Sequence, residues 1–118
     1  MQTVASRVQG TQSMWVLKTA DGAEPAATFR ILPGSIKTIG RAIGADFILE
    51  ATLVSRVHCR LTAGAGEIEL EDLDSTNGTF VNGRRVDGPV RVKAGDRIGV
   101  GRVELEVEAN RELVSPES

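Results

Sequence analysis

Three short polar stretches of the sequence carry side chains that can bind an anion. Guanidinium groups are permanently charged, forked donors that match a tetrahedral oxyanion, and hydroxyl groups add short neutral hydrogen bonds. Glycines beside them allow the backbone to turn tightly or to approach a ligand. The three stretches are Gly40-Arg41, Ser55-Arg56-Val57-His58 and the longer run from Asp72 to Gly83.

The side chains in these stretches divide into three chemical types. Arg41 and Arg56 supply the charged donors, and Ser55 and Thr76 supply the hydroxyls. Asn77 has both a donor and an acceptor, which suits the backbone of an extended peptide. This set fits a phosphomonoester on a peptide, but it also fits a sulfate or a sugar phosphate. Residue chemistry alone therefore predicts an anion site.

The segments around these stretches have the alternation of β-strands. Apolar and polar residues alternate with period two, so one face of each strand can enter a core while the other meets water. Asn82-Gly83 is typical of a type I′ hairpin turn, in which both central residues have positive φ. Many short strands predict an all-β, antiparallel sandwich or barrel with the polar stretches in its loops, and of the two we favour the β-sandwich. The expected strands include residues 14–19, 28–32, 35–39, 57–62, 67–71 and 103–108.

The length of 118 residues fits one domain. Residues 1–13 are polar, rich in small residues and without periodicity, so we expect a flexible N-terminal segment. Residues 110–118 have the same character and are expected to form a flexible tail. The β-pattern, and hence the domain, is expected to occupy residues 14–109.

Charge and hydropathy exclude two classes of partner. The formal net charge is −2, whereas nucleic-acid binders usually carry a basic excess. No apolar run approaches the roughly 20 residues that span a bilayer. Cys59 is the single cysteine and has no internal partner, and the first ten residues contain no signal-peptide apolar region. We therefore expect a cytoplasmic monomer that binds neither nucleic acid nor membrane.

The order of the polar motifs resembles that of the forkhead-associated (FHA) domain family. Gly-Arg is followed by Ser-Arg-x-His and then by Asp-x-x-Ser-x-Asn-Gly-x-x-Val-Asn-Gly, and the resemblance covers nearly all of the chain except its ends. It implies a β-sandwich of about eleven strands whose apical loops bind phosphothreonine peptides. The third motif matches at Asp72, Ser75, Asn77, Gly78, Val81, Asn82 and Gly83.

The resemblance also implies a role for each matching residue. Arg41 would contact the phosphate, and Ser55 would hydrogen-bond one of its oxygens. Arg56 would add a second polar or charged contact to the phosphothreonine, and Thr76 would line the phosphothreonine pocket. Asn77 would hold the main chain of the peptide.

Further matching residues are expected to select the peptide or to shape the loops. Leu53 falls where some members of the family contact the third residue after the phosphothreonine. His58 would brace the binding loops rather than act in catalysis. Structural roles are likewise expected for Gly40, Asp72, Gly78, Asn82 and Gly83.

Catalysis and metal binding find little support in the sequence. His58 and Cys59 are neighbours on a predicted strand, so their side chains should point to opposite faces and cannot form a nucleophile and base pair. One histidine and one cysteine fall short of a tetrahedral zinc set. We expect no metal, no cofactor and no enzymatic activity.

The leading functional hypothesis is a phosphothreonine-peptide-binding module that recruits partners downstream of a serine/threonine kinase. Two alternatives stay open. One is a phospho-independent interaction or oligomerisation scaffold on the same fold. The other is a small anion-dependent enzyme, which the absence of a catalytic arrangement argues against.

Overall fold

The computed structural model describes residues 11–113, which form strands, turns and loops without any helix. This part of the chain therefore contains no helix that could cross a membrane. The strands are β1 (Thr11–Lys18), β2 (Thr28–Ile31), β3 (Ile36–Gly40), β4 (Phe47–Ile48), β5 (Cys59–Ala63), β6 (Ile68–Asp72), β7 (Thr79–Val81), β8 (Arg84–Arg85), β9 (Val90–Val92), β10 (Arg97–Val100) and β11 (Val103–Leu113).

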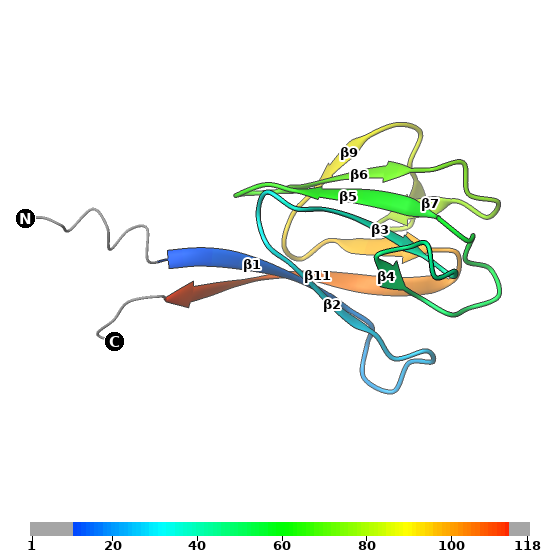
Figure 1. The fold of residues 1–118 in the computed structure, drawn as a ribbon, viewed down its shortest axis with the longest axis horizontal. Coiled ribbons are helices and arrows are strands. Elements are labelled where there is room, and N and C mark those ends of the chain that lie inside the picture. Colours follow the sequence, from blue (N-terminus) through cyan, green and yellow to red (C-terminus); the bar gives the residue numbers. More distant parts are fainter. Residues whose placement is uncertain (1–10, 114–118) are drawn as a thin grey trace, which may run out of the picture.

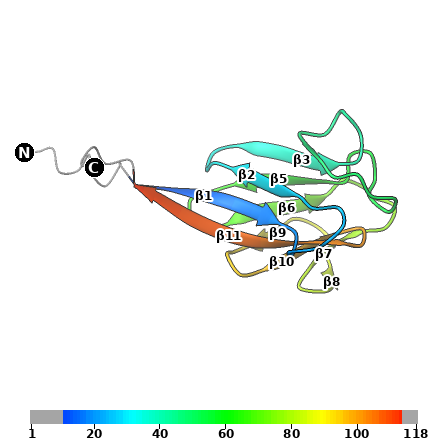
Figure 2. The ribbon, with the colours of Figure 1, turned by 90° about the horizontal axis from the view of Figure 1, so that it is seen from below.

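The strands form two sheets that lie one over the other (Figures 1 and 2). The larger sheet has the order β2-β1-β11-β10-β7-β8, and the smaller one has the order β4-β3-β5-β6-β9. All the pairings are antiparallel except that of β3 with β4, which is parallel. The predicted all-β sandwich of about eleven strands is confirmed.

The core lies between the sheets and is built mainly from aliphatic side chains. Leu17 and Leu105 of the larger sheet and Leu61 and Leu70 of the smaller sheet are fully buried. Trp15 is the largest buried side chain, and its indole N–H donates a hydrogen bond of 2.9 Å to the carbonyl of Gly64. This bond satisfies the buried indole and joins β1 to the turn between β5 and β6.

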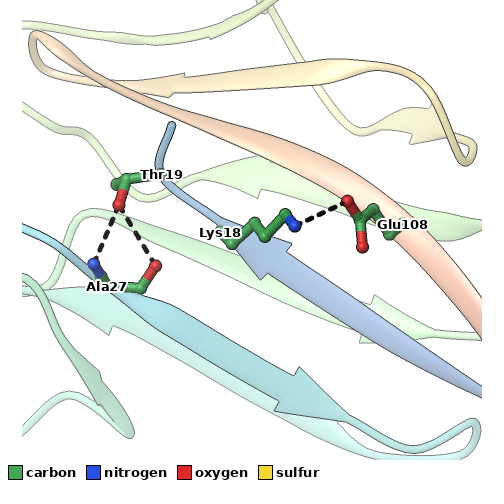
Figure 3. Close-up of polar contacts among 4 residues, drawn as sticks. All are labelled: Lys18, Thr19, Ala27 and Glu108. Carbon is green, nitrogen blue, oxygen red and sulfur yellow. Dashed lines mark hydrogen bonds and ion pairs between the residues drawn. The ribbon is translucent and has the colours of Figure 1, made fainter. Parts of the chain in front are cut away.

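The loop from β1 to β2 is closed at its base by a threonine (Figure 3). The Oγ1 of Thr19 accepts a hydrogen bond of 2.9 Å from the backbone N–H of Ala27 and donates one of 3.3 Å to its carbonyl. Beside it, the ammonium of Lys18 lies 3.2 Å from a carboxylate oxygen of Glu108 on β11. Both groups of this pair are well exposed, so the contact adds little to stability.

The long pair of β1 and β11 makes the predicted domain limits too narrow. The two strands stay in register from Lys18 with Glu106 out to Thr11 with Leu113. Regular pairing thus extends into both of the segments expected to be flexible, 1–13 and 110–118. Because each strand supplies the hydrogen-bonding partners of the other, the pairing needs no apolar periodicity in these polar residues.

The predicted alternation also fails at the start of β5. The sequence pattern placed Val57 on the core side and His58 on the solvent side, but Val57 is 39% exposed and His58 is fully buried. Strand β5 begins only at Cys59, so His58 belongs to the preceding loop. Cys59 is also buried, so the expected division of these two residues into one core-facing and one solvent-facing side chain does not hold.

The loops that carry the polar motifs meet at one end of the sandwich. In Figure 1 the loops from β3 to β4, β4 to β5 and β6 to β7 lie at the right, far from the start of β1 and the end of β11. We call these three loops, residues 41–46, 49–58 and 73–78, the apical loops.

Candidate functional site

The first two apical loops are joined through their backbones where β3 ends. The N–H of Arg41 donates a hydrogen bond of 2.9 Å to the carbonyl of Ser55, and the N–H of Ala42 donates one of 3.2 Å to Arg56. Gly40 makes this approach possible, since a Cβ there would lie only 2.1 Å from the carbonyl oxygen of Arg56. The structure thus provides a spatial reason for Gly40.

The side chain of Arg41 is held at its base and exposed at its tip. Its Nε donates a hydrogen bond of 2.9 Å to the carbonyl of Val54. Within residues 11–113 its terminal nitrogens have no hydrogen-bond partner and no carboxylate pairs with it. One anchored and one solvent-facing edge leave the guanidinium oriented and able to bind an anion.

Ser55 connects the second apical loop to the third. Its Oγ accepts a hydrogen bond of 3.0 Å from the backbone N–H of Thr76. Because the hydroxyl uses a lone pair in this contact, its proton can still be donated to a ligand. Thr76 itself is exposed.

Asn77 lies next to Thr76 and makes a second connection between the same loops. Its Nδ2 donates a hydrogen bond of 3.1 Å to the carbonyl of Leu53. The amide keeps a second N–H and its carbonyl oxygen for a ligand. Asn77 is exposed, whereas Leu53 is half-buried.

His58 is buried between the second and third loops and binds both. Its Nδ1 accepts a hydrogen bond of 2.9 Å from the N–H of Ser55, and its Nε2 lies 2.8 Å from the carbonyl of Gly78. An acceptor at Nδ1 and a carbonyl at Nε2 require the neutral tautomer with its proton on Nε2. Both ring nitrogens are used inside the protein.

Asp72 organises the third loop from the end of β6. It accepts hydrogen bonds from the backbone and hydroxyl of Ser75 and from the hydroxyl of Thr79, and Ser75 Oγ accepts one of 2.9 Å from the N–H of Gly78. Burial opposes ionisation of the carboxyl, but these hydrogen bonds outweigh it and hold the pKa of Asp72 below its usual range. The loop is therefore folded around a carboxylate.

Asn82 and Gly83 lie outside the apical loops, in the turn between β7 and β8. Their φ angles are 51° and 84°, as the predicted type I′ turn requires. The Asn82 side chain donates a hydrogen bond of 3.1 Å to Asp96 and accepts one of 3.0 Å from the N–H of Arg97. The backbone N–H of Lys93 and the Asn82 amide hold the pKa of Asp96 below its usual range. This turn is thereby tied to β10.

The structure thus brings Arg41, Ser55, Thr76 and Asn77 together from three loops. Arg56 joins the loops through its backbone carbonyl, which accepts a hydrogen bond from the N–H of Ala42. Its side chain is exposed and has no ion-pair partner within residues 11–113. Contacts that the sequence did not assign come from Ser75, Thr79, Arg85 and Gly101. Only the contact of Ser75 could have been predicted from the sequence, because the Asp-x-x-Ser spacing of Asp72 and Ser75 is typical of a local turn.

Gly101 is required by the shape of the site although it belongs to another turn. It lies between β10 and β11 with φ 63°, and a Cβ there would come within 2.6 Å of the carbonyl oxygen of Leu53. This is the same carbonyl that Asn77 binds. The turn therefore packs against the backbone of the second apical loop.

Nucleophilic and metal chemistry find no support in the described residues. Burial, together with the negative charge of Asp72, raises the pKa of the Cys59 thiol to about 12, so it is not a thiolate at neutral pH. Among residues 11–113 no three His, Cys, Asp or Glu side chains lie close enough to hold a metal ion.

Known proteins contain sequences similar to this chain. The family model described as "FHA domain" matches residues 37–101, which are more than half of the chain and include all three apical loops. The chain is 40% identical over 78 residues to the ABC transporter ATP-binding/permease protein Rv1747 of Mycobacterium tuberculosis, covering 66% of this chain but only 9% of that protein. It is 32% identical over 103 residues to the oxoglutarate dehydrogenase inhibitor of Corynebacterium glutamicum, covering 87% of this chain and 69% of that protein.

Solved structures give the same result for the fold. One comes from a structural and functional analysis of phosphothreonine-dependent FHA domain interactions, and it matches with a TM-score of 0.71 and 35% sequence identity. The match covers 80% of this chain and 95% of that one. With its motifs, its two sheets and its apical loops in agreement, the chain belongs to the forkhead-associated domain family.

Proposed function

We propose that this domain binds phosphothreonine-containing proteins through its apical loops and so recruits partners of a serine/threonine kinase pathway. The observation that carries the proposal is the convergence of Arg41, Ser55, Thr76 and Asn77, which three separate loops bring to one exposed end of the sandwich. The phosphothreonine-dependent interactions described for a structural neighbour of 35% identity agree with it.

The chemistry of the site divides the task among these residues. The exposed guanidinium of Arg41 binds phosphate oxygens, and the hydroxyl of Ser55 donates to another oxygen. The amide of Asn77 binds the main chain of the peptide, while Thr76 lines the space around the phosphothreonine. Leu53 and Arg56 lie in the second apical loop. Arg56 adds a second contact to the phosphothreonine, and Leu53 contacts the third residue after it. His58, Gly40 and Asp72 hold the loops in place.

A peptide titration tests this function directly. The parent protein is titrated with a phosphothreonine peptide, its phosphoserine counterpart and its unphosphorylated twin, and each titration is repeated with Arg41→Ala. We expect binding only to the phosphorylated peptides, with roughly tenfold preference for phosphothreonine if its methyl group fills a small pocket. Arg41→Ala should weaken binding by tenfold or more, because losing one partner of a hydrogen-bonded charge pair costs about 2–5 kcal/mol.

Arg30→Ala is the matched control, because it removes an equal charge from an exposed position on β2. It should leave both affinity and melting temperature at the parental values. Parental affinity in a folded Arg41→Ala protein would exclude the proposed phosphate site. Equal affinity for the phosphorylated and unphosphorylated peptides would instead favour the phospho-independent scaffold.

A further inference from the structure

Arg85 on β8 lies against the third apical loop, although it is far from the polar motifs in the sequence. A Cβ on Gly78 would be 3.0 Å from Nε and 3.1 Å from Cζ of Arg85. The guanidinium therefore packs over the backbone of the residue that follows Asn77. The absence of a side chain at Gly78 makes room for it.

The position of Arg85 is set by its strand as well as by this contact. Strand β8 pairs with β7 so that Arg85 lies opposite Phe80, and the ring of Phe80 also comes within 3.3 Å of a Cβ on Gly78. The carbonyl of Gly78 is in turn bonded to His58. Arg85 thus packs on a part of the loop that a hydrogen bond to His58 holds in place. Its side chain therefore loses little conformational freedom when a ligand binds.

The charge of Arg85 is not neutralised by the protein. Arg85 is exposed, and none of the ion pairs among residues 11–113 involves it. The neighbouring Arg84 has the same charge but lies opposite Val81, so it projects from the other side of the hairpin. Both arginines contribute to the lining of a cavity beside the hairpin, together with Val81, Val86 and Val90. Of the two arginines, Arg85 is the one whose side chain lies against Gly78 of the third apical loop.

We propose that Arg85 is a specificity residue that binds an acidic side chain of the phosphopeptide, close to the phosphothreonine. The proposal rests on the proposed function, because it takes Asn77 as the residue that holds the peptide. An extended peptide advances about 3.3 Å per residue. A peptide bonded to Asn77 therefore brings one of the next three or so residues beside a side chain that contacts Gly78. A carboxylate there meets an unpaired guanidinium.

The test is a scan of acidic positions. The full chain is titrated with phosphothreonine peptides flanked by alanine, in which one Asp occupies each of the three positions before or after the phosphothreonine. We expect about two- to fivefold tighter binding for Asp over Ala at one position or two neighbouring ones, the range of an exposed ion pair. This preference should shrink as ionic strength rises.

Arg85→Gln should remove the preference for Asp and leave the affinity for the all-alanine phosphopeptide nearly unchanged. Arg84→Gln is the matched control and should retain the preference for Asp. Arg85→Lys retains the charge and should keep part of it, which provides a second variant if the first melts early. The proposal is overturned if the parent shows no position-dependent preference for Asp, if Arg85→Gln retains it, or if Arg84→Gln removes it equally. Phosphorylation-dependent binding without a preference for Asp would overturn only the role of Arg85. Equal affinity for the phosphorylated and unphosphorylated peptides would overturn both proposals.

Discussion

The imidazole of His58 accepts a hydrogen bond at Nδ1 from the backbone N–H of Ser55, at a distance of 2.9 Å. The other ring nitrogen lies 2.8 Å from the carbonyl of Gly78. A single buried ring therefore sets the spacing between the two loops that carry Ser55 and Asn77. Because both nitrogens are occupied, His58 can influence a bound peptide only by positioning these loops.

Replacing His58 with alanine should lower the stability of the domain. It should weaken peptide binding only indirectly, through the positions of the loops. The change leaves the N–H of Ser55 and the carbonyl of Gly78 without their partner and opens a cavity in a buried region. An unsatisfied buried group costs about 1–3 kcal/mol, and 1 kcal/mol lowers the melting temperature by about 4–8 °C in a domain of this size. Thermal unfolding checks this, with the exposed neighbour change Val57→Ala as the control. A variant that melts like the parent but loses phosphopeptide binding would make His58 a contact residue.

Gly40→Ala should strongly lower the stability of the fold although the new side chain is only a methyl group. Its Cβ would lie 2.1 Å from the carbonyl oxygen of Arg56, and this backbone atom cannot rotate away. Separating β3 from the second apical loop should cost about 1–3 kcal/mol or more and weaken peptide binding.

Gly66→Ala provides the comparison for Gly40→Ala, since nothing lies within 4 Å of a Cβ at that position. Chemical denaturation of both variants measures the difference directly. Equal stability of the two would mean that the close approach at Gly40 is absent in solution.

Asp72→Asn should lower stability in a pH-dependent manner. The hydrogen bonds from Ser75 and Thr79 hold the pKa of Asp72 below its usual range in spite of burial. Since the folded protein favours the carboxylate, its contribution is complete above the unfolded pKa of about 3.9 and is lost as the pH falls through the lower pKa of the folded state.

We therefore expect Asp72→Asn to be about 1–2 kcal/mol less stable than the parent at pH 7. The gap should narrow below pH 4, where Asp72 of the unfolded parental chain begins to take up a proton while the folded protein still holds it as a carboxylate. Urea unfolding across this range measures it, and Asp21→Asn, in the exposed loop after β1, should show no such gap. A gap for Asp72→Asn that is constant from pH 7 to pH 3 would contradict the role of the ionised carboxyl.

Much of the architecture followed from local patterns in the sequence. Alternating residues marked β5, β6 and part of β11, because a strand exposes its two faces with period two whatever its partners are. Asn82 and Gly83 identified a hairpin turn, since few residues adopt positive φ without strain. Strands β4, β9 and β10 were not specifically predicted, and β4, with two residues, is too short to show a period.

The sequence by itself determined which polar side chains the domain carries, and the types of Arg41, Ser55 and Asn77 predict an anion site whatever their distances. The order of the motifs, through the family resemblance, extends this prediction to a phosphopeptide. Only the tertiary structure decided how these residues are held and what lies beside them. The burial of His58, the close approach at Gly40 and the packing of Arg85 over Gly78 each join residues from different strands or loops. Such contacts depend on how two sheets and their connecting loops pack together, and local alternation contains no information about that packing.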